Sequence, residues 1–219
     1  MFGLFKRGAG RGVAKPSLDA VRFDVTGYAF QGEPQAGKIR AWLTPEGDGL
    51  GMFFFPMPPN LPANATSVEE LAAYYRQMIG NSGGKLVEIR VVDAGGGPAI
   101  RTILSLPKQP SGRICVGSLT VPFQNFSFVI KCQCEEVGHT GLKAALLLDR
   151  SLAAEEPMPV EGGQFPIPGF DVDDPKHDAE FPHDPVARAR RVLDRVAGSL
   201  TVATEVRQLP SFALPRMDL

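Results

Sequence analysis

The chain has 219 residues, of which 43% are hydrophobic and 21% are charged, and its formal net charge is -1. This composition is typical of a globular domain and excludes an intrinsically disordered chain. No apolar run approaches the ~18 residues of a membrane span, so we expect no membrane-spanning segment. A net charge near zero gives no overall attraction to nucleic acid, and we expect no nucleic-acid partner.

The N-terminal sequence MFGLFKRGAGRGVAK places its basic residues after a short apolar run, whereas a secretory signal places them before a longer one. We interpret residues 1–20 as a flexible tail, open to contact with a membrane or a partner. The chain has three cysteines, which suit a reducing compartment when no export signal is present. We therefore expect a cytoplasmic protein.

Alternation of apolar and polar residues predicts strands with one buried face at residues 21–26 and 39–44. The unbroken apolar run LGMFFF, residues 50–55, predicts a central strand that is covered on both faces. Trp42 and Leu43 point to opposite faces of their strand, which indicates that the second face of the sheet is also partly covered.

A helix is predicted after the proline-rich PMPPNLP. Thr66 and Ser67 each stand three residues before a glutamate, Glu69 or Glu70, which is the spacing of a capping box. The apolar residues that follow recur every three or four positions and predict one buried stripe. Gly80 follows this stripe and is predicted to end the helix in a left-handed conformation.

Four more strands are predicted at residues 85–93, 99–106, 113–121 and 125–135. Their connections are short and rich in Gly, Pro, Ser or Asn, too short for parallel crossovers, so we expect an antiparallel meander. A second helix is expected over residues 142–153, although its ALLL run also suits a strand.

A proline-rich, acidic segment, residues 155–184, precedes a last helix. Asp184 and Pro185 suit the N-cap and the first helical position of that helix. Its face opposite the apolar stripe carries Arg188, Arg191 and Arg195. These arginines are either a surface for an acidic partner or a solvated helix face, and the acidic segment itself is able to screen them.

The stretch GEPQAGKI, residues 32–39, is one residue short of the phosphate-binding loop G-x-x-x-x-G-K-[ST]. Ile39 replaces the hydroxyl that binds magnesium, and Pro34 removes one N–H donor. The sequence after Lys38 alternates like a strand and does not begin a helix. We interpret the stretch as a hairpin loop and expect no bound cofactor.

Cys132, Cys134 and His139 are three soft metal ligands that lie close together in the sequence. Zinc requires a fourth ligand, and alternation places both cysteines on the same strand face as Phe128. We interpret the two cysteines as small core residues, and Cys115 in the same way.

DVDDPKHDAEFPHD, residues 171–184, is the densest group of potential metal ligands in the chain. Its spacing departs from that of a calcium loop, because Pro175 interrupts it and no glutamate closes it. We interpret it as a solvated acidic loop. The alternative is a small hydrolase or a metal-binding enzyme that uses this segment.

Phe165, Ile167 and Phe170 lie in QFPIPGF, within the acidic segment. A long connection without structure of its own is usually functional or disordered, so we expect these apolar residues to dock on a surface. Either they cover the sheet near Trp42, or they form the surface that a protein partner contacts, with the carboxylates steering a basic partner.

The elements predict an α+β layered sandwich, with an antiparallel sheet of about six to seven strands flanked by helices. In the order of its elements the chain resembles the PsbP-like fold family. The stretches that carry the resemblance are LGMFFFPMPPN, then SVEELAAYYRQMI, then a meander ending in FSFVIKCQCEE. The resemblance spans roughly residues 21–200. Because members of that fold mostly act as binding or assembly subunits, it implies a non-catalytic role.

We divide the chain into a tail (1–20), a sheet domain (21–154), the acidic segment (155–184), a C-terminal helix packed on the same domain (185–203) and a second tail (204–219). We expect a non-catalytic binding or assembly module. The candidate partner-binding residues are Phe165, Ile167, Phe170, Arg188, Arg191 and Arg195.

Overall fold

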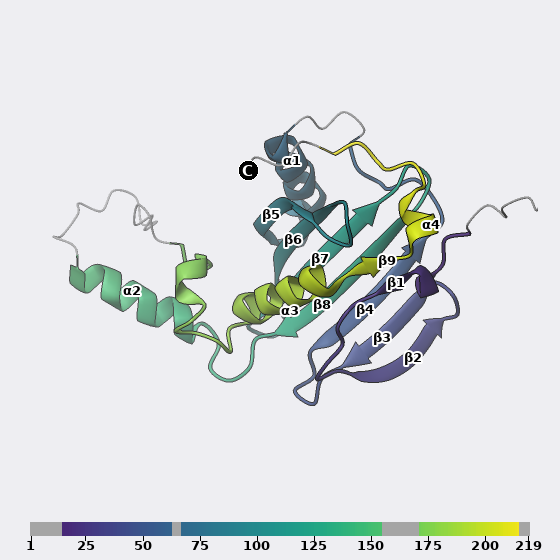
Figure 1. Cartoon of the computed structure of the whole chain (residues 1–219). Helices are drawn as coiled ribbons and strands as arrows, with labels where there is room; N and C mark the ends of the chain where they lie inside the picture. Colours follow the sequence, from purple (N-terminus) through teal and green to yellow (C-terminus); the bar gives the residue numbers. More distant parts are fainter. Residues whose placement is uncertain (1–14, 63–66, 155–170, 215–219) are drawn as a thin grey trace, which may run out of the picture.

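The computed structural model describes residues 15–62, 67–154 and 171–214. Its main element is a seven-stranded antiparallel sheet in the order β2-β3-β4-β8-β7-β6-β5 (Figure 1). The strands are β2 (Ala29–Gln35), β3 (Ile39–Leu43), β4 (Gly49–Phe55), β5 (Lys85–Asp93), β6 (Pro98–Pro107), β7 (Arg113–Pro122) and β8 (Ser127–Glu135). The predicted α+β class and the antiparallel meander from β5 to β8 are confirmed.

The stretch GEPQAGKI lies in the hairpin between β2 and β3. Its first four residues are the end of β2, and Gln35 pairs with Ile39 across the turn. No helix follows it, because Ile39 begins β3. This agrees with the hairpin interpretation.

The first predicted strand is much shorter than its alternation suggested. Only β1 (Val21–Arg22) is extended and paired, and its partner is β9 (Thr201–Val202) and not a strand of the main sheet. Phe23 instead packs edge-on against Trp42, with the ring centroids 5.7 Å apart. The alternating residues therefore lie over the sheet instead of extending it.

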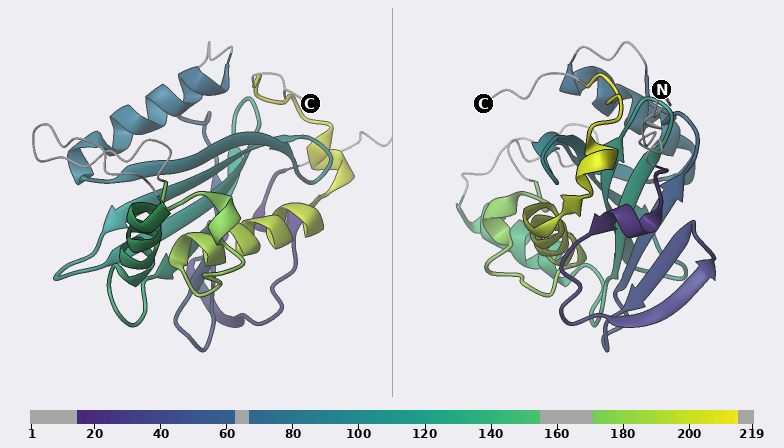
Figure 2. Two further views of the ribbon diagram at one scale, coloured as in Figure 1. Left: turned by 90° about the vertical axis from the view of Figure 1, so that its left-hand side faces the viewer. Right: turned by 45° about the vertical axis from the view of Figure 1, so that its right-hand side comes forward.

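Helices lie on both sides of the main sheet (Figure 2). α3 (Pro185–Ser199) packs across β6, β7 and β8 on one side, which we call the core face. α1 (Val68–Ile79) packs on the other side over β5, and α2 (Leu142–Ala154) projects from the body of the domain (Figure 1). No described helix is long and apolar enough to cross a membrane.

The main core fills the space between α3 and the core face. The following members are each exposed by 2% or less: Leu50, Met52, Leu119, Ile130, Cys132, Leu193 and Val196. Gly117 on β7 permits this close packing, because a Cβ there would lie 2.7 Å from the Cys132 sulfur and 3.0 Å from Leu193 Cδ1.

The residues that cap the helices are those that the sequence predicted, with one difference. Ser67 caps α1 by accepting a hydrogen bond from the Glu70 amide, and Asp184 caps α3 by accepting one from the Val186 amide. Gly80 was predicted to be the left-handed residue after α1, but it is right-handed and begins a 3₁₀ turn. Gly83, with φ of 68°, ends that turn in the left-handed conformation.

Parts of both predicted tails belong to the fold. Leu18, in a short 3₁₀ helix before β1, is 1% exposed. After β9, α4 (Thr204–Arg207) buries Val206. The Arg207 side chain donates hydrogen bonds to the Ala94 and Gly95 carbonyls in the β5–β6 turn, so the chain after α3 is tied to the sheet.

Candidate binding groove

The face of the main sheet opposite α3, which we call the open face, is covered only in part. α1 covers its β5–β6 side, where Leu71 and Tyr75 pack with Ile100. β4 was predicted to be covered on both faces, yet only Leu50 and Met52 on its core face are buried, and Phe55 on the open face is 38% exposed. β4 lies inside the sheet between β3 and β8, as predicted, but the predicted coverage of both faces was wrong because α1 lies at the sheet edge over β5.

A groove of about 400 Å³ runs between α1 and the uncovered strands. Its floor is made by the open-face residues of β6, β7 and β8, and its rim by the loop after β4 and by α1. The most exposed rim residues are Met57 (59%) and Met78 (53%), with Phe55 beside them. Methionine side chains are flexible and adapt to ligands of different shape.

The rim is held in place by contacts between α1 and the loop after β4. Tyr74 donates a hydrogen bond of 2.9 Å to the Asn60 carbonyl, and Leu61 packs against the α1 cluster. Burial and, to a smaller extent, the neighbouring Tyr74 together raise the pKa of Tyr75 to about 12, so the Tyr75 phenol is neutral at physiological pH. The groove thus has a fixed wall of apolar and aromatic side chains.

Three polar residues lie in line across the groove floor. Lys131 on β8 is the register partner of Ser118 on β7, and Ser118 is the register partner of Thr102 on β6. The Ser118 and Thr102 hydroxyls form a hydrogen bond of 2.6 Å. The Lys131 ammonium lies 5.4 Å from the centre of the Phe53 ring, and Lys131 is the one charged residue in the described lining of the groove.

The lining of the groove is mainly apolar. The lining residues that the structure describes include no His, Cys, Asp or Glu, the side chains that most often serve as acids, bases or metal ligands. Most are apolar or carry a single hydroxyl, which is typical of sites that hold an apolar ligand and orient it with few polar contacts.

The predicted partner-binding arginines of α3 all contact their own chain. The Arg188 Nη1 lies 3.0 and 3.1 Å from the two carboxylate oxygens of Asp48. Arg195 donates to the Thr26 carbonyl, and Arg191, which is exposed, donates to the Pro182 carbonyl. Phe165, Ile167 and Phe170 lie outside the described residues. A role for these six residues in partner binding stays a prediction.

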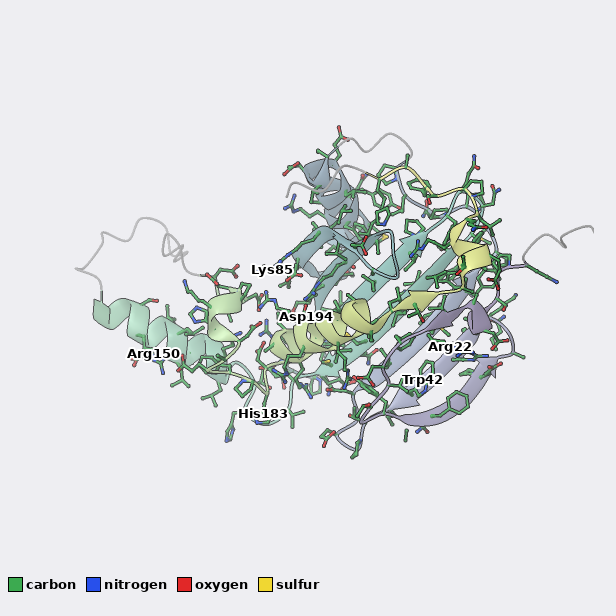
Figure 3. The ribbon with its side chains drawn as sticks, in the orientation of Figure 1. Arg22, Trp42, Lys85, Arg150, His183 and Asp194 are labelled. Carbon is green, nitrogen blue, oxygen red and sulfur yellow. The ribbon has the colours of Figure 1, made fainter. Side chains whose placement is uncertain are left out.

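The segment 171–184 is solvated only in part: Glu180 and His183 are exposed, as expected of a solvated loop, but two of its carboxylates are buried. The side chains of Asp173 and Asp184 are 5% and 6% exposed, and each carboxylate lies 2.6 Å from the guanidinium of Arg113 on β7. Lys85 on β5 lies 3.1 Å from Asp173 (Figure 3). Arg113 and Lys85 lie far from the segment in the sequence, so its composition alone could not show that they pair with these buried carboxylates.

The two histidines of this segment do not join its aspartates in a metal site. His183 is exposed in the turn before α3 (Figure 3). Across the described ranges, no group of three or more His, Cys, Asp or Glu side chains is arranged to hold a metal ion. Cys115, Cys132 and Cys134 are free and fully buried, which confirms their interpretation as core residues.

The sequence did not predict the groove, nor the charged cluster beneath α3 that Glu88, Arg101 and Arg190 form. Glu88 and Arg190 are both more than nine-tenths buried. A sign of the cluster was present, because Glu88 stands between the apolar residues Val87 and Ile89 within β5. A sign of the groove was also present, because Phe53 and Phe55 share a strand face that no predicted helix was assigned to cover.

No family model matches the chain, and no curated protein matches its sequence. Among solved structures, the chain is similar to the cyanobacterial PsbP (CyanoP) of Synechocystis sp. PCC 6803, with 11% identity, a TM-score of 0.37, and 68% of this chain and 96% of that chain covered. It is also similar to PA94 of Pseudomonas aeruginosa, described as a protein of unknown function and putative regulator. There the identity is 8%, the TM-score 0.32, and the coverage 61% and 84%.

The structural match to CyanoP agrees with the PsbP-like order of elements seen in the sequence. It is a weak likeness of fold alone.

Proposed function

We propose that this protein is a non-catalytic binding module that holds an apolar ligand in the groove between α1 and the open face. The observation that carries the proposal is the groove's rim, where Phe55, Met57 and Met78 expose apolar surface next to a strip of sheet that α1 leaves uncovered. Large exposed apolar patches beside a concave surface are typical of ligand-binding sites.

The shape of the site supports the same proposal. The rim is fixed by the Tyr74–Asn60 hydrogen bond, so little order has to be created when a ligand binds. We further propose that the protein acts in the cytoplasm. The absence of disulfides among Cys115, Cys132 and Cys134 is compatible with a reducing compartment.

The proposal is tested with Nile red, a neutral dye that fluoresces in apolar surroundings. We expect the native protein to bind about one equivalent. The double variant Met57→Asp, Met78→Asp should lose this binding, because it places two charges at the rim while leaving the core intact. Leu142→Asp is the matched control, since Leu142 on α2 is 50% exposed but lies outside the groove.

Two results would count against this function. One is the absence of dye binding to the native protein. The other is equal binding by the rim variant and the control, because the dye would then be bound elsewhere.

A further inference from the structure

We infer that the ligand of the groove is a small amphiphile with a single carboxylate head and an apolar body, an inference that rests on the proposed binding function. The head would lie at Lys131 and Ser118. The body would extend over the floor of β7 and β8 toward Met57 and Met78 on the rim.

The charge of the site selects an anionic head. Lys131 is exposed, makes no ion pair with a described carboxylate, and is held against the face of the Phe53 ring. A cation in a groove that is otherwise uncharged favours a ligand with one negative charge. A dianionic phosphate is a poorer fit, because phosphate sites are usually built from arginine forks or several backbone N–H groups.

The hydroxyls beside Lys131 complete a site for a carboxylate. Directly paired residues on neighbouring antiparallel strands hold their Cβ atoms ~5 Å apart, so the Lys131 ammonium and the Ser118 hydroxyl are able to reach the same head group. When Thr102 donates its proton to Ser118, the Ser118 proton is free to point at the ligand. The carboxylate would then accept one hydrogen bond from Ser118 and one from Lys131.

The remainder of the groove selects an apolar body. Val129 on β8 is the register partner of both Thr120 and Phe53, so a row with two apolar side chains and one hydroxyl runs next to the head-group row. Beyond it the space opens between Tyr74 and Met78 on α1 and Met57 on the loop. A volume of about 400 Å³ lies within the usual range for small-molecule sites.

The test measures binding of three probes with the same ten-carbon chain by calorimetry: decanoate, decanol and decyltrimethylammonium. We expect decanoate to bind about fivefold more tightly than the other two, the size typical of a partly exposed ion pair. Lys131→Gln should remove this difference and Lys131→Arg should keep it. Ser118→Ala should weaken decanoate binding and leave decanol binding unchanged.

Lys38→Gln is the matched control, since Lys38 is an exposed lysine in the β2–β3 turn, outside the groove. It should bind all three probes as the native protein does.

These measurements distinguish failure of the carboxylate inference from failure of the proposed binding function. Equal binding of all three probes, unchanged in Lys131→Gln, would overturn the carboxylate inference while the proposed binding function stands. No binding of any probe, together with no Nile red binding, would remove both. If an apolar peptide with an amidated C-terminus bound more tightly than decanoate, the occupant would be a protein segment and this inference would be wrong.

Discussion

Arg190 on α3 and Glu88 on β5 form a buried ion pair, with the Arg190 Nε 3.1 Å from the Glu88 Oε2. The other Glu88 oxygen lies 2.8 Å from the Nε of Arg101 on β6. One carboxylate therefore separates two guanidiniums between α3 and the edge of the sheet. The two arginines have further partners, Asp178 for Arg190 and Asp194 for Arg101.

Replacing the central carboxylate should destabilise the fold strongly. We expect Glu88→Gln to lower the free energy of unfolding by about 3 kcal/mol, because it leaves two buried cations without the anion between them. Urea unfolding measures this. Glu180→Gln is the control: Glu180 pairs with Arg150 at 2.6 Å, but both side chains are largely exposed, so the change should stay under about 1 kcal/mol. Equal effects of the two variants would contradict a buried role for Glu88.

Asp173 should make stability depend on pH in the acid range. Burial raises the pKa of this carboxyl, but Arg113 and Lys85 outweigh burial and hold the pKa below its ordinary value. The native state thus binds the proton less readily than the unfolded state does. Its contribution is present above pH ~4 and is lost as the pH falls through the folded pKa.

Unfolding followed between pH 6 and 2 checks this expectation. Asp173→Asn should be less stable than the native protein at pH 6 and should lose less stability on acidification. Asp149→Asn, at an exposed position on α2, should follow the native curve. The expectation fails if Asp173→Asn shows the native pH dependence.

Gly117 should not tolerate a side chain. Gly117→Val would force the Cβ against Cys132 and Leu193 and move α3 away from the sheet, so we expect a loss of about 1–3 kcal/mol. Gly198→Ala on α3 is the opposite case, because nothing beyond the adjacent turns of its own helix lies within 4 Å of the added Cβ and alanine favours the helix. It should leave stability unchanged or raise it slightly. Thermal melting of both variants distinguishes a steric cause from a general effect of losing glycine.

The three thiols should be unreactive in the native state. Each is fully buried, and burial raises the pKa of Cys115 to about 12. A thiol reagent such as Ellman's, added at pH 8, should therefore label the native protein only as fast as it unfolds, and all three thiols should react at once in guanidinium. Rapid labelling of one cysteine without denaturant would contradict the burial of that residue.

Local patterns in the sequence were sufficient to predict most of the elements. The strands from β5 to β8 were predicted within about two residues because period-two alternation and short turns leave one arrangement open. Ser67 and Asp184 were correctly predicted as caps because a cap depends on residues only two or three positions away. The alternation at residues 21–26 led to a wrong prediction of a full strand. Such a pattern indicates that one face is buried, but it does not show which surface covers that face.

The features that the sequence did not predict depend on contacts between residues far apart in the chain. Asp173 is paired with Arg113 and Lys85, which are sixty or more positions away, so the segment reads as a solvated loop until the fold is known. The groove depends on where α1 lies on the sheet, and the pattern of α1 shows which of its faces is buried but not which strands it covers. The buried role of Arg188 was missed for the same reason, since its partner Asp48 lies on a turn between β3 and β4.

Because α3 covers the core face and is synthesised after the sheet, the core face stays exposed during much of synthesis. A ribosome releases all seven strands of the main sheet before it releases Leu193 and Val196 on α3. During that interval Leu119 and Ile130 face water, and β1 has no partner until β9 appears. The nascent chain therefore carries a wide apolar surface late in its synthesis, which makes it prone to aggregation and a suitable client for a chaperone that binds such surfaces.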